Sequence, residues 1–181
     1  MRQNSPQLQL EVVSNDLLSP QTRSEIVDLC THAFEEDFAP LLAPFHGAVH
    51  VLGRLGPKLV THALWVTRWL QAGTKPIMRT AYVEAVATEK AYRRRGFATA
   101  VMKRLAQEIQ AYDLGGLSPF SVAYYARLGW ELWRGPLFIR TDDGLLPTLE
   151  AEDVMILRLP NTPDLDLDAP LCAEWREGEL W

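Results

Sequence analysis

A charged turn between a strand pattern and a helix pattern constrains the fold of this chain most. The apolar run Tyr-Val-Glu-Ala-Val-Ala-Thr at 82–88 leads to Arg93-Arg94-Arg95-Gly96-Phe97-Ala98, and apolar residues then recur at helical spacing up to Tyr112. Gly96 therefore falls in the first helical turn, where unpaired backbone N–H groups and the helix dipole favour an anion. Three arginines add full charges. The pattern predicts a pyrophosphate site, and a solvated basic face is the alternative.

The spacing Arg-x-x-Gly-x-Ala resembles the acetyl-CoA motif of the GNAT superfamily of N-acetyltransferases. The match covers six positions, and the preceding strand and following helix make it more specific than an isolated glycine-rich loop. The resemblance implies acetyl-CoA as the cofactor, with coenzyme A as product. Backbone N–H groups at the end of the strand are expected to take the thioester carbonyl and the pantetheine amides. The cofactor-binding candidates are Val86, Ala87, Thr88, Arg93, Arg94, Arg95, Gly96, Phe97, Ala98 and Thr99.

Length and composition favour one domain. The chain has 181 residues, 48% hydrophobic and 23% charged, which suits a single domain over residues 1–181. Two distant cysteines, Cys30 and Cys172, lack metal-ligand spacing, so a reduced cytoplasmic protein is expected. The N-terminus lacks a signal-peptide core, and no stretch approaches the ~20 apolar residues that span a bilayer. We therefore expect no metal, no secretion and no membrane partner.

Acidic residues are concentrated near the C-terminus. Residues 142–181 hold 11 of the 23 Asp and Glu residues but only two bases, Arg158 and Arg176. This charge disfavours nucleic-acid binding, which needs clustered Lys and Arg, and favours a polycationic partner. A solubilising tail is the simpler interpretation, but the apolar run Val154–Leu159 and residues such as Trp175 and Trp181 argue against disorder.

The periodicity predicts an α+β protein. Strands are expected at 8–13, 49–55, 60–70, 77–88, 137–140 and 154–159, and helices at 21–34, after Gly96 and at 121–128. Gly115-Gly116 is expected to stop the second helix, with a short strand beginning at Leu117-Ser118. This order resembles the GNAT acyl-CoA N-acyltransferase fold, a mixed and mostly antiparallel central sheet flanked by helices. In that fold a parallel pair of strands splays to admit the pantetheine arm.

Two further residues are candidates for catalysis. The segment from Ser121 to Trp130 resembles the family's tyrosine-bearing segment, in which the hydroxyl protonates or hydrogen-bonds the leaving thiolate while the amine attacks the thioester directly. Tyr125 is the candidate, with a core aromatic as the alternative; a phenol pKa near ~10 suits this donor. Glu84 is a carboxylate in an otherwise apolar strand, so it could bind the amine and act as a remote base through water. A partnered structural glutamate is the alternative.

Over most of its length the chain resembles the aminoglycoside 2′-N-acetyltransferases. The similar segments are Ala33-Phe34-x-x-Asp37-Phe38, 82–87, Leu114-Gly115-x-Leu117-Ser118, Tyr125-Ala126-x-x-Gly129-Trp130 and Cys172-x-x-Trp175-Arg176-x-Gly178-x-x-Trp181. The resemblance implies that acids and the terminal carboxylate of Trp181 hold the antibiotic. Trp181 joins Tyr125 and Glu84 as a catalytic candidate. The substrate-binding candidates are Asp37, Glu84, Ala85, Ser118, Glu152, Asp153, Glu179 and Trp181.

Departures from the family pattern leave the acceptor open. Positions 152 and 179 carry Glu where Asp is expected, and the bulky Pro119-Phe120 follows Ser118, so substrate preference is expected to differ from that of relatives. The alternatives are acetylation of another small polyamine or peptide amine, and a non-catalytic module that binds acyl-CoA or aminoglycosides. The family resemblance also suggests a homodimer. The four histidines, at positions 32, 46, 50 and 62, receive no chemical role.

Overall fold

The computed structural model describes residues 7–148, 152–178 and 180–181. Its contacts divide the chain into two compact units. Unit 1 comprises Met1–Trp65 and Ala85–Leu105, and unit 2 comprises Val66–Glu84 and Ala106–Trp181. Two long strands, β3 (Lys58–Ala72) and β4 (Met78–Thr88), contribute residues to both units. The expectation of a single domain over 1–181 stays a prediction.

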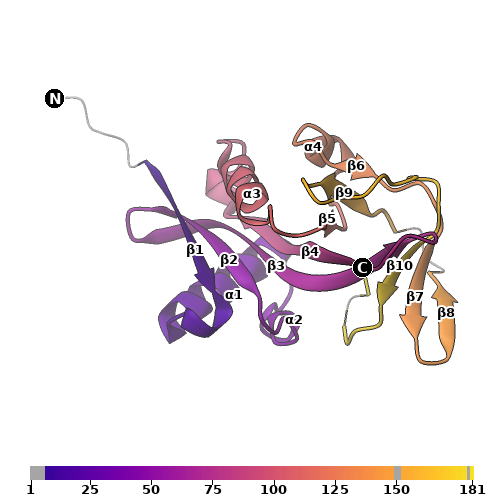
Figure 1. Ribbon diagram of the computed structural model, residues 1–181. Helices are drawn as coiled ribbons and strands as arrows, with labels where there is room; N and C mark the ends of the chain where they lie inside the picture. The colour runs from indigo at the N-terminus through magenta and orange to yellow at the C-terminus, as the bar shows by residue number, and fades with distance from the viewer. Residues whose placement is uncertain (1–6, 149–151, 179) are drawn as a thin grey trace. The chain divides into compact units, whose positions relative to one another are not determined.

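Unit 1 contains three antiparallel strands with helices on both faces. β1 (Leu8–Ser14) pairs with β2 (Val49–Leu55), which pairs with the first half of β3. Helices α1 (Pro20–Phe34) and α2 (Ala39–Leu42) lie on one face of these strands, and α3 (Phe97–Glu108) lies on the other (Figure 1). Two 3-10 turns, η1 (Asn15–Leu17) and η2 (Lys90–Tyr92), complete the unit.

Local signals explain the first helix. The Ser19 hydroxyl accepts a hydrogen bond from the Thr22 N–H at 3.1 Å, and Pro20 occupies the first turn, where its missing N–H costs nothing. Glu35 ends the helix in the left-handed region, with φ of 62°. The buried face packs Ile26, Leu29 and Cys30 against strand residues such as Leu52 and Leu59.

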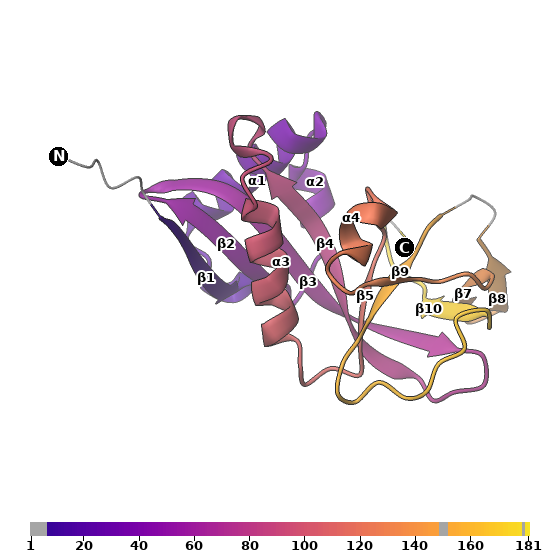
Figure 2. The same ribbon diagram turned by 90° about the horizontal axis from the view of Figure 1, so that it is seen from above.

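Unit 2 contains the rest of the sheet. It adds six strands, β5 (Leu114–Leu117), β6 (Glu131–Leu132), β7 (Leu137–Thr141), β8 (Gly144–Pro147), β9 (Met155–Arg158) and β10 (Leu171–Glu174). Together with β3 and β4, they follow the order β6-β9-β5-β4-β3-β10-β7-β8 in the sheet. The short helix α4 (Val122–Ala126) contacts β6, next to which it lies in Figure 1, and Figure 2 shows the paired strands β5 and β9. The β4–β5 and β7–β10 pairs are parallel. The β5–β9, β6–β9, β7–β8 and β3–β10 pairs are antiparallel. The parallel β4–β5 pair agrees with the expected mixed sheet.

One sequence expectation is wrong in detail. Gly115 and Gly116 do not stop a helix; they lie inside β5, which ends at Leu117 rather than beginning there. A Cβ at Gly116 would lie 2.8 Å from the ring atom Cδ2 of Tyr82, and one at Gly115 would lie 3.0 Å from Cβ of Leu157. The glycines therefore serve close packing between strands, a role that looks like a helix stop in the sequence.

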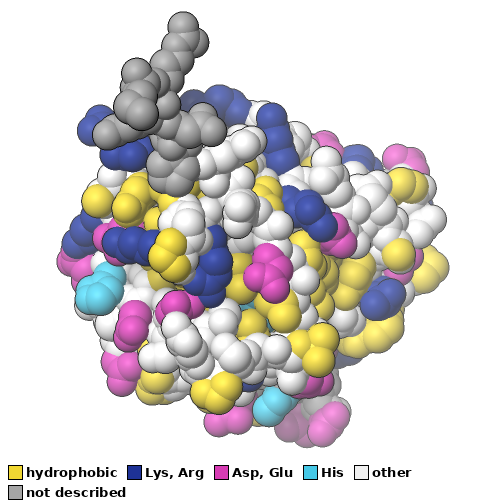
Figure 3. Space-filling view, turned by 90° about the vertical axis from the view of Figure 1, so that its left-hand side faces the viewer, with side chains coloured by type: hydrophobic (Ala, Val, Ile, Leu, Met, Phe, Trp, Pro, Cys, Tyr) yellow, Lys and Arg dark blue, Asp and Glu magenta, His cyan; other side chains and the backbone are white. Residues whose placement is uncertain are grey.

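Surface and composition expectations have partial answers. Both cysteines are free and buried. None of the described helices is long and apolar enough to cross a membrane. On the described part of the face in Figure 3, basic and acidic side chains are interspersed.

The elements α2, β6, β8 and β10 were not predicted, because each has five or fewer residues and too little periodicity to be recognised.

Candidate active site

The turn before α3 has the shape of an anion cradle. Gly96 has φ of 79° and Arg94 has φ of 63°, so both adopt the left-handed conformation. The Gly96 carbonyl accepts the first helical hydrogen bond, from Ala100 N–H at 3.0 Å, and the geometry of a helix start leaves the N–H groups of its first turn without acceptors inside the helix. A Cβ added at Gly96 would meet no atom within 4 Å, so open space lies over this backbone. These features fit the pyrophosphate of acetyl-CoA.

The three arginines of the turn differ in their surroundings. The Arg93 guanidinium donates to the carbonyls of Thr88, at 3.1 Å, and Ala33, at 3.2 Å, so it braces the turn against α1 and β4. Arg95 stacks over the Tyr92 ring, with its Cζ 5.2 Å from the ring centre. All three side chains are exposed. Arg93 therefore stabilises the turn through its two hydrogen bonds. The predicted contact of the three arginines with the cofactor stays a prediction.

The last part of β4 bends at Ala85. This residue has φ of 52°, unusual for a non-glycine residue, and its carbonyl accepts a hydrogen bond from His62 Nδ1 at 3.0 Å. Two residues on, the Ala87 carbonyl accepts from the Thr61 hydroxyl at 3.0 Å. Side chains of β3 thus hold the strand that carries the predicted cofactor contacts Val86–Thr88. Burial and the neighbouring ring lower the pKa of His62, so this imidazole is neutral at pH 7.

Asp37 lies in an acidic groove of unit 1. The groove is lined by Thr31, His32, Glu35, Glu36, Asp37 and Lys90. Asp37 is exposed, and its Oδ1 accepts a hydrogen bond at 3.1 Å from the N–H of Ala39, the first residue of α2. Lys90 forms an ion pair with Glu35. Asp37 therefore has acidic neighbours, as a site for a cationic substrate requires, although it also has a structural role.

Glu84 is the centre of a charged cluster in unit 2. Its Oε1 accepts from the Arg176 guanidinium at 2.6 Å, and both side chains are largely buried. Tyr82 lies beside it, with the guanidinium groups of Arg68 and Arg176 at 5.0 and 5.6 Å from its ring centre. Burial, together with the charges of Glu84 and Glu152, raises the pKa of the Tyr82 phenol. Glu84 and Glu152, which were predicted from separate segments, thus both raise the pKa of the same buried phenol, that of Tyr82.

Tyr125 is buried among aromatic rings. Phe120, Tyr124 and Trp130 surround it at 5.4, 5.0 and 6.3 Å between ring centres. Burial raises the pKa of its phenol above the ordinary value near ~10, and a phenol is protonated at neutral pH in either case. A proton donor needs that state. The aromatic packing also fits the alternative core role, and the two are compatible.

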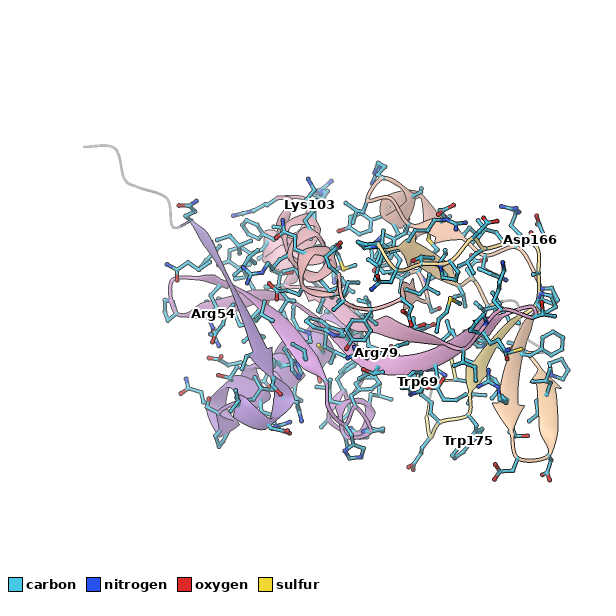
Figure 4. All side chains as sticks on the ribbon, in the orientation of Figure 1. Arg54, Trp69, Arg79, Lys103, Asp166 and Trp175 are labelled. Atoms are coloured by element: carbon cyan, nitrogen blue, oxygen red, sulfur yellow. The ribbon has the colours of Figure 1, made fainter. Side chains whose placement is uncertain are left out.

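The C-terminal segment is anchored inside unit 2. The Trp181 ring is buried, and its Nε1 donates to the Thr148 hydroxyl at 2.8 Å. Arg68, 1% exposed, donates to the Leu180 carbonyl at 2.7 Å and to Glu174. Trp69 on β3 and Trp175 after β10 are both exposed and lie near each other in Figure 4. The ring of Trp181 thus serves as an anchor, and its predicted catalytic role stays a prediction.

The remaining substrate candidates have varied positions. Ser118 is exposed and donates to the Asp153 carbonyl at 3.3 Å, which brings these two candidates together in unit 2. Ala85 lies in unit 1, at the bend of β4. Glu179 lies outside the described residues. Among the described residues, no group of three or more His, Cys, Asp or Glu side chains could hold a metal ion.

Sequence reasoning missed several charged and polar residues near these sites. Arg68 and Arg176 orient the charged cluster, but a single arginine on a strand or in a tail gives no sign of its partner. His50 and His62 received no role, yet His50 Nδ1 lies 2.9 Å from His62 Nε2. The available signal was the hairpin: with a turn at Gly56-Pro57, positions 50 and 62 fall on adjacent strands near the same level.

Comparisons with known proteins identify the family of this chain. A family model described as an acetyltransferase (GNAT) domain matches residues 18–133. The chain belongs to this family. It is 34% identical over 173 residues, 91% of this chain and 87% of the other, to an aminoglycoside 2′-N-acetyltransferase of Mycolicibacterium fortuitum. The chain is thus an acetyl-CoA-dependent acyltransferase, as expected.

Solved structures agree in fold. The GNAT N-acetyltransferase YhbS from Escherichia coli, in complex with CoA, has a TM-score of 0.63 at 15% identity, covering 95% of this chain and 92% of that one. A probable N-acyltransferase from Enterococcus faecalis has a TM-score of 0.56 at 20% identity over 71% of this chain. This chain spans about a third of that protein's length (33%). The predicted α+β GNAT fold is confirmed.

Proposed function

We propose that this GNAT enzyme transfers the acetyl group of acetyl-CoA to the 2′-amine of aminoglycosides. The observation that carries the proposal is the 34% identity to an aminoglycoside 2′-N-acetyltransferase over 91% of the chain. The acids support it: Glu35, Glu36 and Asp37 line a groove of unit 1, and Glu84 and Glu152 lie near Tyr82 in unit 2. An aminoglycoside carries several ammonium groups, which such carboxylates bind by charge-assisted hydrogen bonds. Acetylation would neutralise one of these charges and so confer resistance.

The cofactor residues all belong to unit 1. Acetyl-CoA supplies the acetyl group as a thioester, from which we propose direct transfer without an acetyl-enzyme. The N–H groups of Val86, Ala87 and Thr88 donate hydrogen bonds to the carbonyl and pantetheine amides. The backbone of Arg94–Ala98 and the arginine side chains bind the pyrophosphate. Open space over Gly96 and the fixed bend at Ala85 support this assignment.

Glu84 binds the acceptor amine without giving up Arg176. A carboxylate has about four acceptor positions, and the Arg176 contact at 2.6 Å uses one of them on Oε1. A substrate ammonium can therefore share the anion, and its proton passes through water to solvent. Ser118, Asp153, Glu152 and the terminal residue Trp181 complete the substrate set that we propose, together with Asp37. Tyr125, whose phenol is protonated at neutral pH, donates to the leaving thiolate.

Two antibiotics that differ at one carbon provide the test. Kanamycin B has a 2′-amine and kanamycin A has a 2′-hydroxyl, so we expect release of coenzyme A with the first and a product acetylated at the 2′ nitrogen by NMR. Kanamycin A should give no acetylation at that carbon. Acetylation of both drugs at another amine would disprove the 2′ assignment while leaving the acyltransferase activity intact. Turnover of a small polyamine or a peptide amine, with no aminoglycoside modified, would overturn the substrate class.

A further inference from the structure

A buried chain of hydrogen bonds runs from β4 to a pocket in unit 1. The Ala85 carbonyl can only accept, so His62 Nδ1, 3.0 Å away, carries a proton; the Cys30 Sγ lies farther from the same nitrogen, at 3.8 Å. A neutral His62 then has a lone pair on Nε2, which accepts from His50 Nδ1 at 2.9 Å. Both rings are buried, at 0% and 3% exposed. The two contacts therefore fix the tautomer of each histidine, and His50 Nε2 is left with a lone pair.

That lone pair has no donor in the described part of the chain. Its sole neighbour within hydrogen-bond distance there is Asn15 Oδ1, at 3.4 Å. The Arg23 guanidinium donates to the same Oδ1 at 3.1 Å and to the Asn15 carbonyl at 3.0 Å, so the amide oxygen, rather than the amide nitrogen, faces His50. Two acceptors thus face each other. Protonating His50 would resolve this, but burial and the charge of Arg23 lower its pKa well below neutrality.

The unsatisfied nitrogen lies in the wall of a cavity. Its volume is about 310 Å³, at the lower end of the range for small-molecule pockets. Much of the wall is apolar, and its larger apolar residues are Leu18, Ile26, Val27, Leu42, Phe45 and Leu64. The polar part of the wall is Asn15, Arg23, His46 and His50, and no carboxylate lines the cavity within the described residues. A polycation such as the proposed substrate therefore does not fit this wall.

We propose that this cavity binds a small neutral alcohol with an apolar ring, a phenol or an alicyclic alcohol, whose hydroxyl donates to His50 Nε2. The hydroxyl thus supplies the donor that the histidine lone pair lacks. A carboxylate would place negative charge against the histidine lone pair, and an ammonium would meet Arg23. The ring would occupy the apolar wall and gain from leaving water.

Binding has a readout at a distance from the cavity. The hydroxyl adds one link to the chain His50–His62–Ala85, and linked hydrogen bonds polarise one another. The last link ends on the peptide group between Ala85 and Val86. The backbone N–H of Val86 therefore reports whether the ligand engages the histidine chain, independently of any catalytic activity.

The test is a titration of the full-length protein with phenol, followed by NMR of histidine rings and backbone amides. We expect saturable shifts of the His50 ring and the Val86 amide. His50→Leu should weaken phenol at least tenfold and leave toluene, which has the ring but no hydroxyl, unchanged or tighter. His50→Gln, which keeps an acceptor, should retain phenol binding and guards against a folding defect in the leucine variant. Leu42→Trp, which fills the cavity, should lose both probes.

Other outcomes would overturn the proposal. These are an absence of saturable phenol binding, phenol affinity that does not depend on residue 50 in folded variants, and preference for benzoate or cyclohexylamine over phenol. Because the assay uses no acetyl-CoA and no aminoglycoside, failure of the proposed function leaves its result unaffected. The wild type, His50→Leu and His50→Gln should be compared by circular dichroism, so that each affinity belongs to a folded protein.

Discussion

At the scale of single residues, the Tyr82 hydroxyl is buried and has no hydrogen-bond partner among the described residues. A buried unpaired hydroxyl costs about 1–3 kcal/mol. Tyr82→Phe removes the hydroxyl and keeps the ring over which Arg68 and Arg176 lie, so we expect the free energy of unfolding in urea to stay the same or rise by roughly 1 kcal/mol. Tyr112→Phe, which removes a hydroxyl 3.1 Å from the Thr67 hydroxyl, should give no gain. A clear loss of stability in Tyr82→Phe would show that its hydroxyl has a partner.

Tyr125 allows a residue-scale test of catalysis that rests on the proposed function. Tyr125→Phe keeps the aromatic packing with Phe120 and Trp130 but removes the proposed donor. We expect kcat to fall by about 10²–10⁴-fold, the usual size of a general-acid contribution, with little change in the KM for acetyl-CoA. Tyr124→Phe is the matched control and should keep most of kcat. Equal kcat in both variants and the wild type would return Tyr125 to a packing role.

The sequence singled out part of these sites, and the roles stay predictions. Glu84 and Gly96 are unusual in their local patterns, as a charge in an apolar strand and a glycine at a helix start, whereas Tyr125 was chosen through the resemblance of its segment to the family. Arg68 and Arg176 could not, because their roles depend on partners more than 90 positions away, such as Leu180 for Arg68 and Glu84 for Arg176. Only the fold supplies those pairs.

At the scale of elements, long periodic segments were predictable, and of the short ones β7 and β9 were predicted while α2, β6, β8 and β10 were not. Strands β2 and β4 and helix α1 lie within a residue of their expected bounds, because seven or more residues carry a clear period. β5 was displaced, since glycine has no side chain to show which way the strand faces. Its glycines are explained only by the close approach of the Tyr82 ring and Leu157.

The turn at Gly96 gives a prediction at the element scale. Gly96→Glu places a negative charge and a side chain at the start of α3, where φ is 79°, and should abolish acetyl-CoA binding in calorimetry. Gly96→Ala is the control, since it carries the same backbone strain, about 1–2 kcal/mol, without the charge. We expect alanine to weaken the cofactor and glutamate to remove it. Unchanged affinity in a folded glutamate variant would contradict the placement of the pyrophosphate.

At the scale of the whole molecule, the acid-rich C-terminal quarter is folded where it is described. β9, β10 and the buried Trp181 all belong to it. The acids therefore lie on a packed structure and do not form a solubilising tail. The apolar residues among the acids had predicted this. The division into two compact units was not predictable, because β3 and β4 are continuous in sequence and their periodicity gives no sign of where one set of contacts ends.

The two buried histidines predict how the stability of the molecule depends on pH. Burial lowers the pKa of both His50 and His62 in the folded state, whereas an unfolded histidine titrates near ~6.5. Below that pH the unfolded chain binds more protons than the folded one, so stability is present above ~6.5 and is lost as the pH falls toward the folded values. Each histidine contributes a slope of up to about 1.4 kcal/mol per pH unit, which is half that size at pH 6.5, so the pair should lower the free energy of unfolding by up to about 3 kcal/mol between pH 6.5 and pH 5. Urea unfolding at half-unit steps of pH would measure this slope.

A variant with His32→Gln and His46→Gln, which changes only exposed rings, should keep the slope. A variant with His50→Gln and His62→Gln should lose most of it. If the second variant showed the wild-type slope, carboxylates rather than the histidine pair would set the acid stability of this protein.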